Sequence, residues 1–259
     1  MDQGGVFVIL FKMVRYHQKK YPSYIPLHLE EVAGHFDVRR VFPTLPYSLH
    51  TEYSYGKRTF QSELIQKYPE IVRANQDGIP QLWKNEVWAE SFAAFLMELT
   101  KNMPAPSVIE IHPPFHDYVG SMREFIEIYQ VFETQIKSRW QETDILIENR
   151  CGSRYRGGRF LISTAPQIKE LCAWIESEHL KLRIAFDIPQ LYTAHQVTPK
   201  RSYEICALLE ELKEIRQYIG GVHIWGKRTS HSRRISHCGD LNTYFNNDMQ
   251  LKAAFLDSL

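Results

Sequence analysis

The stretch "DILIEN", residues 144–149, is a short run of aliphatic residues that ends in a carboxylate and an amide. A run of this length between polar segments is typical of a buried β-strand. The segment after it, "RCGSRYRGGR" (150–159), contains arginines and glycines but no acid. Because an isolated carboxylate is costly to desolvate, Glu148 at the end of this strand requires a cation or a hydrogen-bond donor beside it.

The same kind of run recurs along the chain. The other predicted strands are "VFVILF" (6–11), "YSLH" (47–50), "SVIEIH" (107–112), "LRIAFD" (182–187) and "GGVHIW" (220–225). Segments with apolar residues at helical spacing lie between them, namely 86–101, 121–140, 165–180 and 200–219. Alternating strands and helices predict parallel β/α units, and 259 residues suit a single-domain (β/α)8 TIM barrel. A doubly wound open sheet is the alternative, but no Gly-x-Gly-x-x-Gly motif follows the first strand.

Composition narrows the class of protein. The formal net charge of +1 gives no general basic field for nucleic acid, so anion binding requires local clusters of charge. No segment approaches the roughly 18 consecutive apolar residues of a membrane span, and the run at 6–11 is too short for a signal peptide. The four cysteines are widely spaced and form no Cys-x-x-Cys pair. We therefore expect free thiols and a cytoplasmic protein without a membrane partner.

Ligand-type side chains stand at the ends of most predicted strands. They are His50, His112, Glu148, Asp187 and His223. The C-terminal ends of the strands of a parallel barrel converge on one face, which holds the active site. Imidazole and carboxylate groups are typical ligands of Zn²⁺ and Mn²⁺. The pattern predicts a metal centre at this face, where the ion would offset the cost of burying Glu148.

These motifs resemble the endonuclease IV branch of the xylose-isomerase-like TIM barrels, which are zinc-dependent enzymes that cut DNA at abasic sites. The resemblance covers roughly residues 6–240. Its motifs are "LPYSLHTEY" (45–53), "VIEIHPPF" (108–115), "ILIENRCG" (145–152), "IAFDIPQ" (184–190) and "GGVHIWGKR" (220–228). It implies metal ligation by His50, His112, Glu148, Asp187, His223 and His237, and it implies catalytic roles for Glu148 and Asp187. Glu148 is the carboxylate that is expected to bridge two metals.

The sequence departs from this family at the third zinc site. The family has a histidine three residues after the strand aspartate, whereas this chain has Gln190, with His195 further along. The family's late Asp-x-His motif reads Ile-Ser-His at 235–237, so its aspartate is absent. The resemblance therefore implies two zinc ions rather than three, with Mn²⁺ as an alternative. Only six strands are clear in the sequence. We therefore expect the barrel to lack its first and last strands, either because the chain is a fragment or because its barrel is trimmed.

Two basic segments follow predicted site strands and contain no acid. Residues 149–159 carry Arg150, Arg154 and Arg156, and residues 226–236 carry Lys227 and Arg228. Arginine and lysine bind phosphate oxygens, and glycine allows the backbone to approach them closely. Tyr53 and Tyr155 offer rings on which bases can stack. The segments predict a DNA backbone as partner, although surface loops are often basic.

Glu110 lies two residues before His112 and therefore on the same face of its strand. We expect it to orient a ligand histidine or to pair with an arginine.

Three functions fit these residues. The first is a metal-dependent phosphodiester hydrolase that acts on abasic or damaged DNA in repair. The second is a sugar isomerase or epimerase of the same superfamily, which would act on a small sugar or sugar phosphate and needs two opposed carboxylates for proton transfer. The third is a non-catalytic member that keeps the fold.

Overall fold

Seven parallel strands form one sheet in which each strand pairs with its neighbours in chain order. The computed structural model describes residues 12–15, 23–24, 26–33, 43–51, 62–73, 81–155, 157–197, 202–230, 233–236, 241–245 and 247–258. The strands are β1 (Val14–Arg15), β2 (Leu29–Ala33), β3 (Tyr47–His50), β4 (Val108–Ile111), β5 (Asp144–Glu148), β6 (Leu182–Asp187) and β7 (Ile219–His223). This order, without a reversal point, is that of a (β/α)8 barrel rather than a doubly wound sheet. Within the described residues β7 does not pair with β1, so the fold is a partial barrel, as the sequence predicted.

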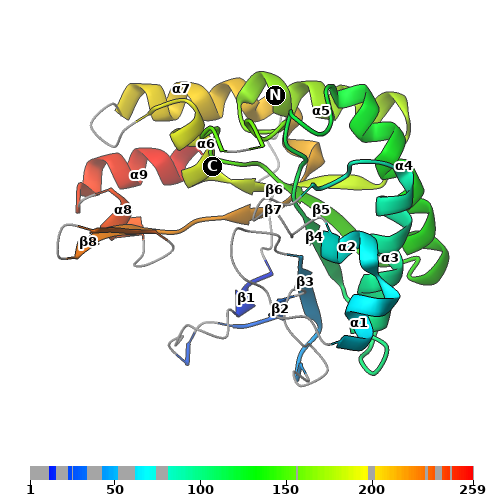
Figure 1. Ribbon diagram of the computed structural model, residues 1–259. Helices are drawn as coiled ribbons and strands as arrows, with labels where there is room; N and C mark the ends of the chain where they lie inside the picture. Colours follow the sequence, from blue (N-terminus) through cyan, green and yellow to red (C-terminus); the bar gives the residue numbers. More distant parts are fainter. Residues whose placement is uncertain are drawn as a thin grey trace, which may run out of the picture.

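From β3 onward, helices follow the parallel strands and cover the outer face of the curved sheet (Figure 1). They are α1 (Ser62–Lys67), α2 (Pro69–Arg73), α3 (Glu86–Leu99), α4 (Met122–Arg139), α5 (Ala165–Ser177), α6 (Ile188–Ala194), α7 (Ser202–Leu212), the 3-10 helix η2 (Lys213–Tyr218), α8 (Leu241–Tyr244) and α9 (Met249–Ser258). In Figure 1, α3, α4, α5 and α7 succeed one another around the sheet. Among the described residues, no helix combines the length and the hydropathy that crossing a membrane requires.

Five of the six predicted strands are confirmed to within about two residues, while the segment 6–11 lies outside the described part of the chain. Three details of the sequence-based prediction are wrong. The segment 200–219 is not one α-helix, because α7 ends at Leu212 and the tighter 3-10 winding of η2 leads directly into β7. The basic segment 226–236, for which the sequence predicted no strand, contains an antiparallel hairpin of β8 (Lys227–Ser230) and β9 (Arg233–Ser236). Strand β2 was not predicted, because its sequence "LEEVA" has adjacent glutamates.

The two faces of the sheet differ in chemistry. Ile109 and Ile111 of β4, like Ile145 and Ile147 of β5, are fully buried in the main core. Successive side chains of a strand point to opposite faces, so the residues between them face the interior of the partial barrel. That interior face carries Glu110 and His112 from the β4 segment, and Leu146 and Glu148 from β5. Helix packing therefore fixes the strands from outside, and polar side chains gather inside.

An aromatic cluster between α3 and α4 supports the end of β4. Trp83 stands at its centre, with ring centroids of Trp88, Phe125 and Phe132 at 5.1, 5.5 and 5.3 Å. The indole Nε1 of Trp83 donates a hydrogen bond of 2.7 Å to the buried carbonyl of His112. The core thus holds the backbone of a residue whose side chain faces the interior.

We expect Trp83→Phe to destabilise the protein by about 2–4 kcal/mol, because it leaves the His112 carbonyl without its donor and opens space in the core. Urea unfolding measures the loss. Trp88→Phe, the same substitution in the same cluster, controls for ring volume, and an equal loss in both variants would show that the hydrogen bond to His112 contributes nothing.

Candidate metal centre

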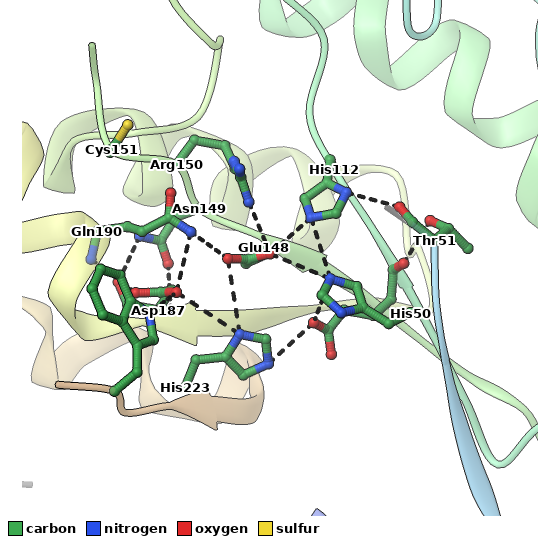
Figure 2. A network of polar contacts seen from close by, with 12 residues as sticks. His50, Thr51, His112, Glu148, Asn149, Arg150, Cys151, Asp187, Gln190 and His223 are labelled. Carbon is green, nitrogen blue, oxygen red and sulfur yellow. Dashed lines mark hydrogen bonds and ion pairs between the residues drawn. The ribbon is translucent and has the colours of Figure 1, made fainter. Parts of the chain in front are cut away.

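The structure brings the five predicted strand-end residues together in the interior of the partial barrel (Figure 2). His50 ends β3, Glu148 ends β5, Asp187 ends β6 and His223 ends β7, while His112 directly follows β4. The register of the sheet places strand ends at the same level, since Asp187 is the cross-strand partner of His223. Their closeness follows from the convergence of parallel strand ends. Their use as metal ligands remains a prediction.

A first group of possible ligands consists of His50, His112 and Glu148, whose ligand atoms all lie within 4.8 Å of one another. The Nε2 atoms of the two histidines are 3.5 Å apart, and His112 Nε2 is 2.8 Å from Glu148 Oε2. When each imidazole is neutral with its proton on Nδ1, these three atoms are all acceptors, and they converge on one point. Such a point requires a proton or a metal cation.

The other nitrogen of each imidazole already has a partner. His112 Nδ1 lies 2.9 Å from the carbonyl oxygen of Thr51, which can only accept a hydrogen bond. His50 Nδ1 lies 3.0 Å from a carboxylate oxygen of Glu31 on β2. Both partners assign the proton to Nδ1 and leave Nε2 as the ligating atom of the neutral ring, which is the arrangement that orients metal-binding histidines. Glu31 was not predicted, because β2 itself was not.

A second group of possible ligands consists of Glu110, Glu148 and His223, again within 4.8 Å of one another. Glu110 Oε1 is 3.1 Å from His223 Nε2, and Glu148 Oε1 is 3.9 Å from His223 Nδ1. Glu148 is common to both groups, so one carboxylate faces two places where a cation fits. The signal for Glu110 in the sequence is a lone acid inside the apolar run "VIEI" (108–111), two residues before His112.

Asp187 lies beside these groups and has a structural role of its own. It is the N-cap of α6, where its Oδ1 accepts a hydrogen bond of 2.8 Å from the backbone N–H of Gln190. Its Oδ2 accepts hydrogen bonds of 2.8 Å from Trp225 Nε1 and 3.1 Å from Gln190 Nε2. The Gln190 amide also donates to Glu148 Oε1 and so ties the two carboxylates together.

His195, which follows the position of Gln190, does not join the centre. It is the C-cap of α6, and its Nε2 accepts a hydrogen bond of 2.9 Å from the backbone N–H of Ala165 at the start of α5. Gln190 is therefore the side chain that stands where the resembled family has a histidine, and it supplies a donor instead of a ligand.

Burial and charge pull the pKa values of the centre apart. Burial disfavours the charged form of His50, but the charges of Glu110 and Glu148 and hydrogen bonds to Glu148 and Glu31 raise its pKa to about 10. Burial also opposes ionisation of Glu148. The charge of Arg150 and the hydrogen bonds between Glu148 and the imidazoles nevertheless hold the pKa of Glu148 well below its usual range. Burial and the Arg150 charge lower the pKa of His112. Without a metal, the first group is therefore satisfied by a proton on His50.

Arg150 is a cation beside Glu148, in addition to the metal ion that the sequence predicts there. Its Nη1 donates a hydrogen bond of 3.0 Å to Glu148 Oε2, and its guanidinium stacks over the ring of Phe160 at 5.3 Å. Arg154, by contrast, is exposed on the same loop. Phosphate binding by both remains a prediction.

Other predicted site residues are not described by the structure. Tyr53, Arg156 and His237 lie outside the described residues. Lys227 and Arg228 belong to β8, whose backbone is described but whose side chains are not.

The loop that carries Arg150 is anchored to the segment after β4 by aromatic stacking. The rings of Phe115 and Phe160 stack at 4.0 Å, and Tyr155 meets them edge-on at 6.0 and 5.8 Å. Tyr155 and Gly158 exchange backbone hydrogen bonds of 2.7 and 3.1 Å in a tight turn. Gly158 has a φ of 87°, a conformation that side chains disfavour.

Gly158→Ala is expected to lower the free energy of unfolding by about 1–3 kcal/mol, since an added Cβ meets both the positive φ and the Asp117 carboxylate. That Cβ would lie 2.5 Å from Asp117 Oδ1, whereas a Cβ at Gly120 meets only Glu124 Oε2 at 3.6 Å. Gly120→Ala, analysed by the same urea titration, is the control and should change stability by less than about 0.5 kcal/mol. Equal effects would show that the turn tolerates a side chain.

Comparisons with known proteins show a similarity of fold and nothing further. No protein-family model and no curated protein matches this sequence. The solved structure "The crystal structure of AsfvAP:AG" aligns with a TM-score of 0.51 at 10% identity, over 96% of this chain and 87% of that one. The probable 3-DHS dehydratase AsbF from Bacillus anthracis aligns with a TM-score of 0.45 at 13% identity, over 86% and 75% of the two chains. A xylose isomerase domain protein from Planctomyces limnophilus aligns with a TM-score of 0.43 at 12% identity, over 90% and 85%.

Proposed function

We propose that this protein is a two-metal phosphodiester hydrolase whose substrate is DNA with an abasic or damaged site. The proposal rests on the convergence of two imidazole Nε2 atoms, 3.5 Å apart, on a carboxylate that also belongs to a second group of ligand atoms. Nitrogen and oxygen donors of this kind fit Zn²⁺, with Mn²⁺ as the alternative. The buried convergence of acceptors supports a resident cation, since protons or metals alone can satisfy it.

The residues of the chain hold the geometry that hydrolysis needs. Glu31 and the Thr51 carbonyl keep the imidazoles of His50 and His112 in the ligating tautomer. Arg150 and Gln190 fix the Glu148 carboxylate, because each donates a hydrogen bond to a different one of its two oxygens. Divalent ions in such a centre lower the pKa of water toward neutrality and stabilise charge on the attacking and leaving oxygens of an in-line displacement.

Substrate recognition is assigned to the basic segments that follow the site strands. The loop after β5 carries Arg150 and the exposed Arg154, and the hairpin that contains Lys227 and Arg228 begins four residues after His223. Both segments start at strand ends in the same centre, which supports a position beside it. We assign them, together with Arg156 and Tyr53, to the phosphates and bases of DNA. The endonuclease IV resemblance supports an abasic lesion as the target.

Zinc-loaded protein is expected to nick a duplex that contains one abasic site, to lose this activity in chelator, and to spare an undamaged duplex. His112→Ala should lower the rate by ~100-fold or more, because it removes a ligand atom from the first group. His116→Ala removes an exposed histidine just past the same strand and is the matched control. Protein that holds stoichiometric zinc but shows no chelator-sensitive nicking would refute the hydrolase.

A sugar isomerase or epimerase is the second candidate, and Glu110 favours it. Proton transfer between carbon atoms of a sugar requires two groups on the reacting face. The carboxylates of Glu110 and Glu148 both approach His223, at 3.1 and 3.9 Å. Glu110 thus adds a further carboxylate to the two, Glu148 and Asp187, that the sequence predicts in the centre. Incubation of the metal-loaded protein with ketohexoses and their phosphates in D₂O tests this candidate. Deuterium exchange at C2 or C3 without nicking of DNA would replace the hydrolase by the isomerase.

A further inference from the structure

Glu110 has the features of a ligand rather than of an orienting group. It is 6% exposed and lies in the sheet opposite His50 of β3 and Leu146 of β5. Its Oε1 points toward the imidazoles, 3.1 Å from His223 Nε2 and 3.6 Å from His50 Nε2. Although these ionic contacts are close, Oε1 is completely buried and accepts no well-aligned hydrogen bond. A buried carboxylate oxygen without a donor is costly unless a cation meets it.

Asp187, the residue that the resemblance assigns as a ligand, is in the opposite situation. Its Oδ1 accepts from the Gln190 backbone, and its Oδ2 accepts from Trp225 Nε1 and from the Gln190 amide. A cation that bound Asp187 would compete with these three donors for the lone pairs of the carboxylate, and displacement of the Gln190 backbone N–H would loosen the start of α6. At Glu110 Oε1, a cation would displace only the ionic contacts with His223 and His50.

The curl of the sheet explains how a residue of β4 reaches β7. Leu146 of β5 fills the interior between them and packs against the glycines of β7. A Cβ at Gly220 would lie 2.4 Å from Leu146 Cδ2, and a Cβ at Gly221 would lie 3.1 Å from Leu146 Cδ1. Because these glycines have no side chains, β7 can lie close to Leu146. This brings His223 to the Glu110 carboxylate across two strands. The sheet of the described residues adds no strand beyond β7 that could supply another carboxylate.

We propose that Glu110, Glu148 and His223 form a second divalent-cation site, in which Glu110 takes the ligand position that the family resemblance assigns to Asp187. This inference rests on the proposed metal centre and specifies the ligands of its second ion. The first site, formed by His50, His112 and Glu148, shares only Glu148 with it.

The test is the zinc content of purified full-length protein after equilibration with zinc and removal of the excess, measured by elemental analysis. Glu110→Gln and Asp187→Asn each remove one negative charge from the same centre while keeping the size of the side chain. We expect two ions in the wild type, one in Glu110→Gln and two in Asp187→Asn. Circular dichroism confirms that each variant is folded. If Glu110→Gln does not fold, Glu110→Asp replaces it, because aspartate keeps the negative charge on a shorter side chain that lies further from the ion. Glu110→Asp should weaken binding of the second ion at least tenfold in a zinc titration.

The outcomes separate this inference from the proposed function. A wild-type protein without bound metal would refute the proposed hydrolase. A wild type with one ion, or a Glu110→Gln variant that keeps two, would overturn the second site while the first remains. Loss of an ion from Asp187→Asn, with two retained in Glu110→Gln, would assign the ligand to Asp187. His112→Ala should lose the other ion and keep the site at Glu110.

Discussion

Replacement of Glu148 by glutamine is expected to empty the whole centre and to abolish activity. Glu148 belongs to both groups of possible ligands, and among the residues that the structure describes no other side chain does. A glutamine keeps the size of the side chain but lacks the charge and offers a neutral oxygen to each cation. We expect zinc content to fall from two ions to none and nicking to fall by ~1,000-fold or more. Elemental analysis and the abasic-duplex assay measure the two losses independently.

The same substitution should destabilise the metal-free protein. The Glu148 carboxylate, 3% exposed, is the buried counter-charge for Arg150 at 3.0 Å and lies 3.8 Å from His50. Removal of the Glu148 charge takes from Arg150 its buried carboxylate partner, whereas His50 keeps Glu31 and Glu110. Breaking a buried ion pair in this way costs about 3–5 kcal/mol. Urea unfolding in chelator gives the value. Stability equal to that of the wild type would mean that Arg150 finds other compensation and that the pair contributes nothing.

Glu98→Gln is the matched control. Glu98 also accepts from two cations, Lys67 at 2.7 Å and Lys101 at 2.6 Å, but these lysines are exposed on the surface. Surface pairs contribute less than about 1 kcal/mol, so this variant should keep its zinc, its activity and nearly all of its stability.

The strand ends of this fold can be read from sequence because most of the predicted strands are short runs with a titratable residue at or near the end. His50, Glu148 and Asp187 stand where a strand buried by helices meets the open face, and parallel topology alone makes them neighbours. Glu31 could not be found this way. In β2 the adjacent glutamates face opposite sides, with Glu30 bonded to Arg15 and Thr44 and Glu31 bonded to His50, so no apolar run marks the strand.

The roles of Glu110 and Gln190 depend on distances that no local pattern encodes. The spacing of Glu110 from His112 gives its face of the strand, but its approach to His223 depends on how tightly Leu146 packs against β7. The contact of Gln190 with two carboxylates depends on α6 starting at Asp187, a short helix whose signal is an aspartate two residues before Pro189. Sequence therefore identified the residue types of the centre, and the curvature of the sheet decided their partners.

Metal-free protein is expected to lose stability as the pH rises from about 6.5 to about 10, because His50 releases its proton over this interval. The pKa of His50 is raised from 6.5 to about 10 in the folded protein, chiefly by Glu110 and Glu148 against the opposing effect of burial. A group with a raised folded pKa contributes its full stabilisation below the unfolded pKa and loses it as the pH climbs to the folded value. The slope for one proton is about 1.4 kcal/mol per pH unit, so the loss should reach about 2–4 kcal/mol.

His50→Gln isolates this contribution, since glutamine keeps a donor for Glu31 but cannot titrate. Urea unfolding in chelator at about pH 6.5 and about pH 9.5 should show a larger loss for the wild type than for His50→Gln. Asp187, whose pKa burial and the Glu148 charge raise to about 7, also titrates within this interval, but it is common to both proteins, so its contribution cancels in the comparison. Parallel losses in the two proteins would show that His50 carries no extra proton.

Zinc should remove the wild-type loss, because a cation on Nε2 takes the place of the proton between His50, His112 and Glu148. Zinc-loaded protein holds neutral imidazoles at every pH above the unfolded pKa, so its stability should not fall between about pH 6.5 and about pH 9.5. If zinc and chelator gave the same pH dependence, the proton and the metal would not compete for one place. The convergence of ligand atoms would then be a hydrogen-bonded cluster and not a metal centre.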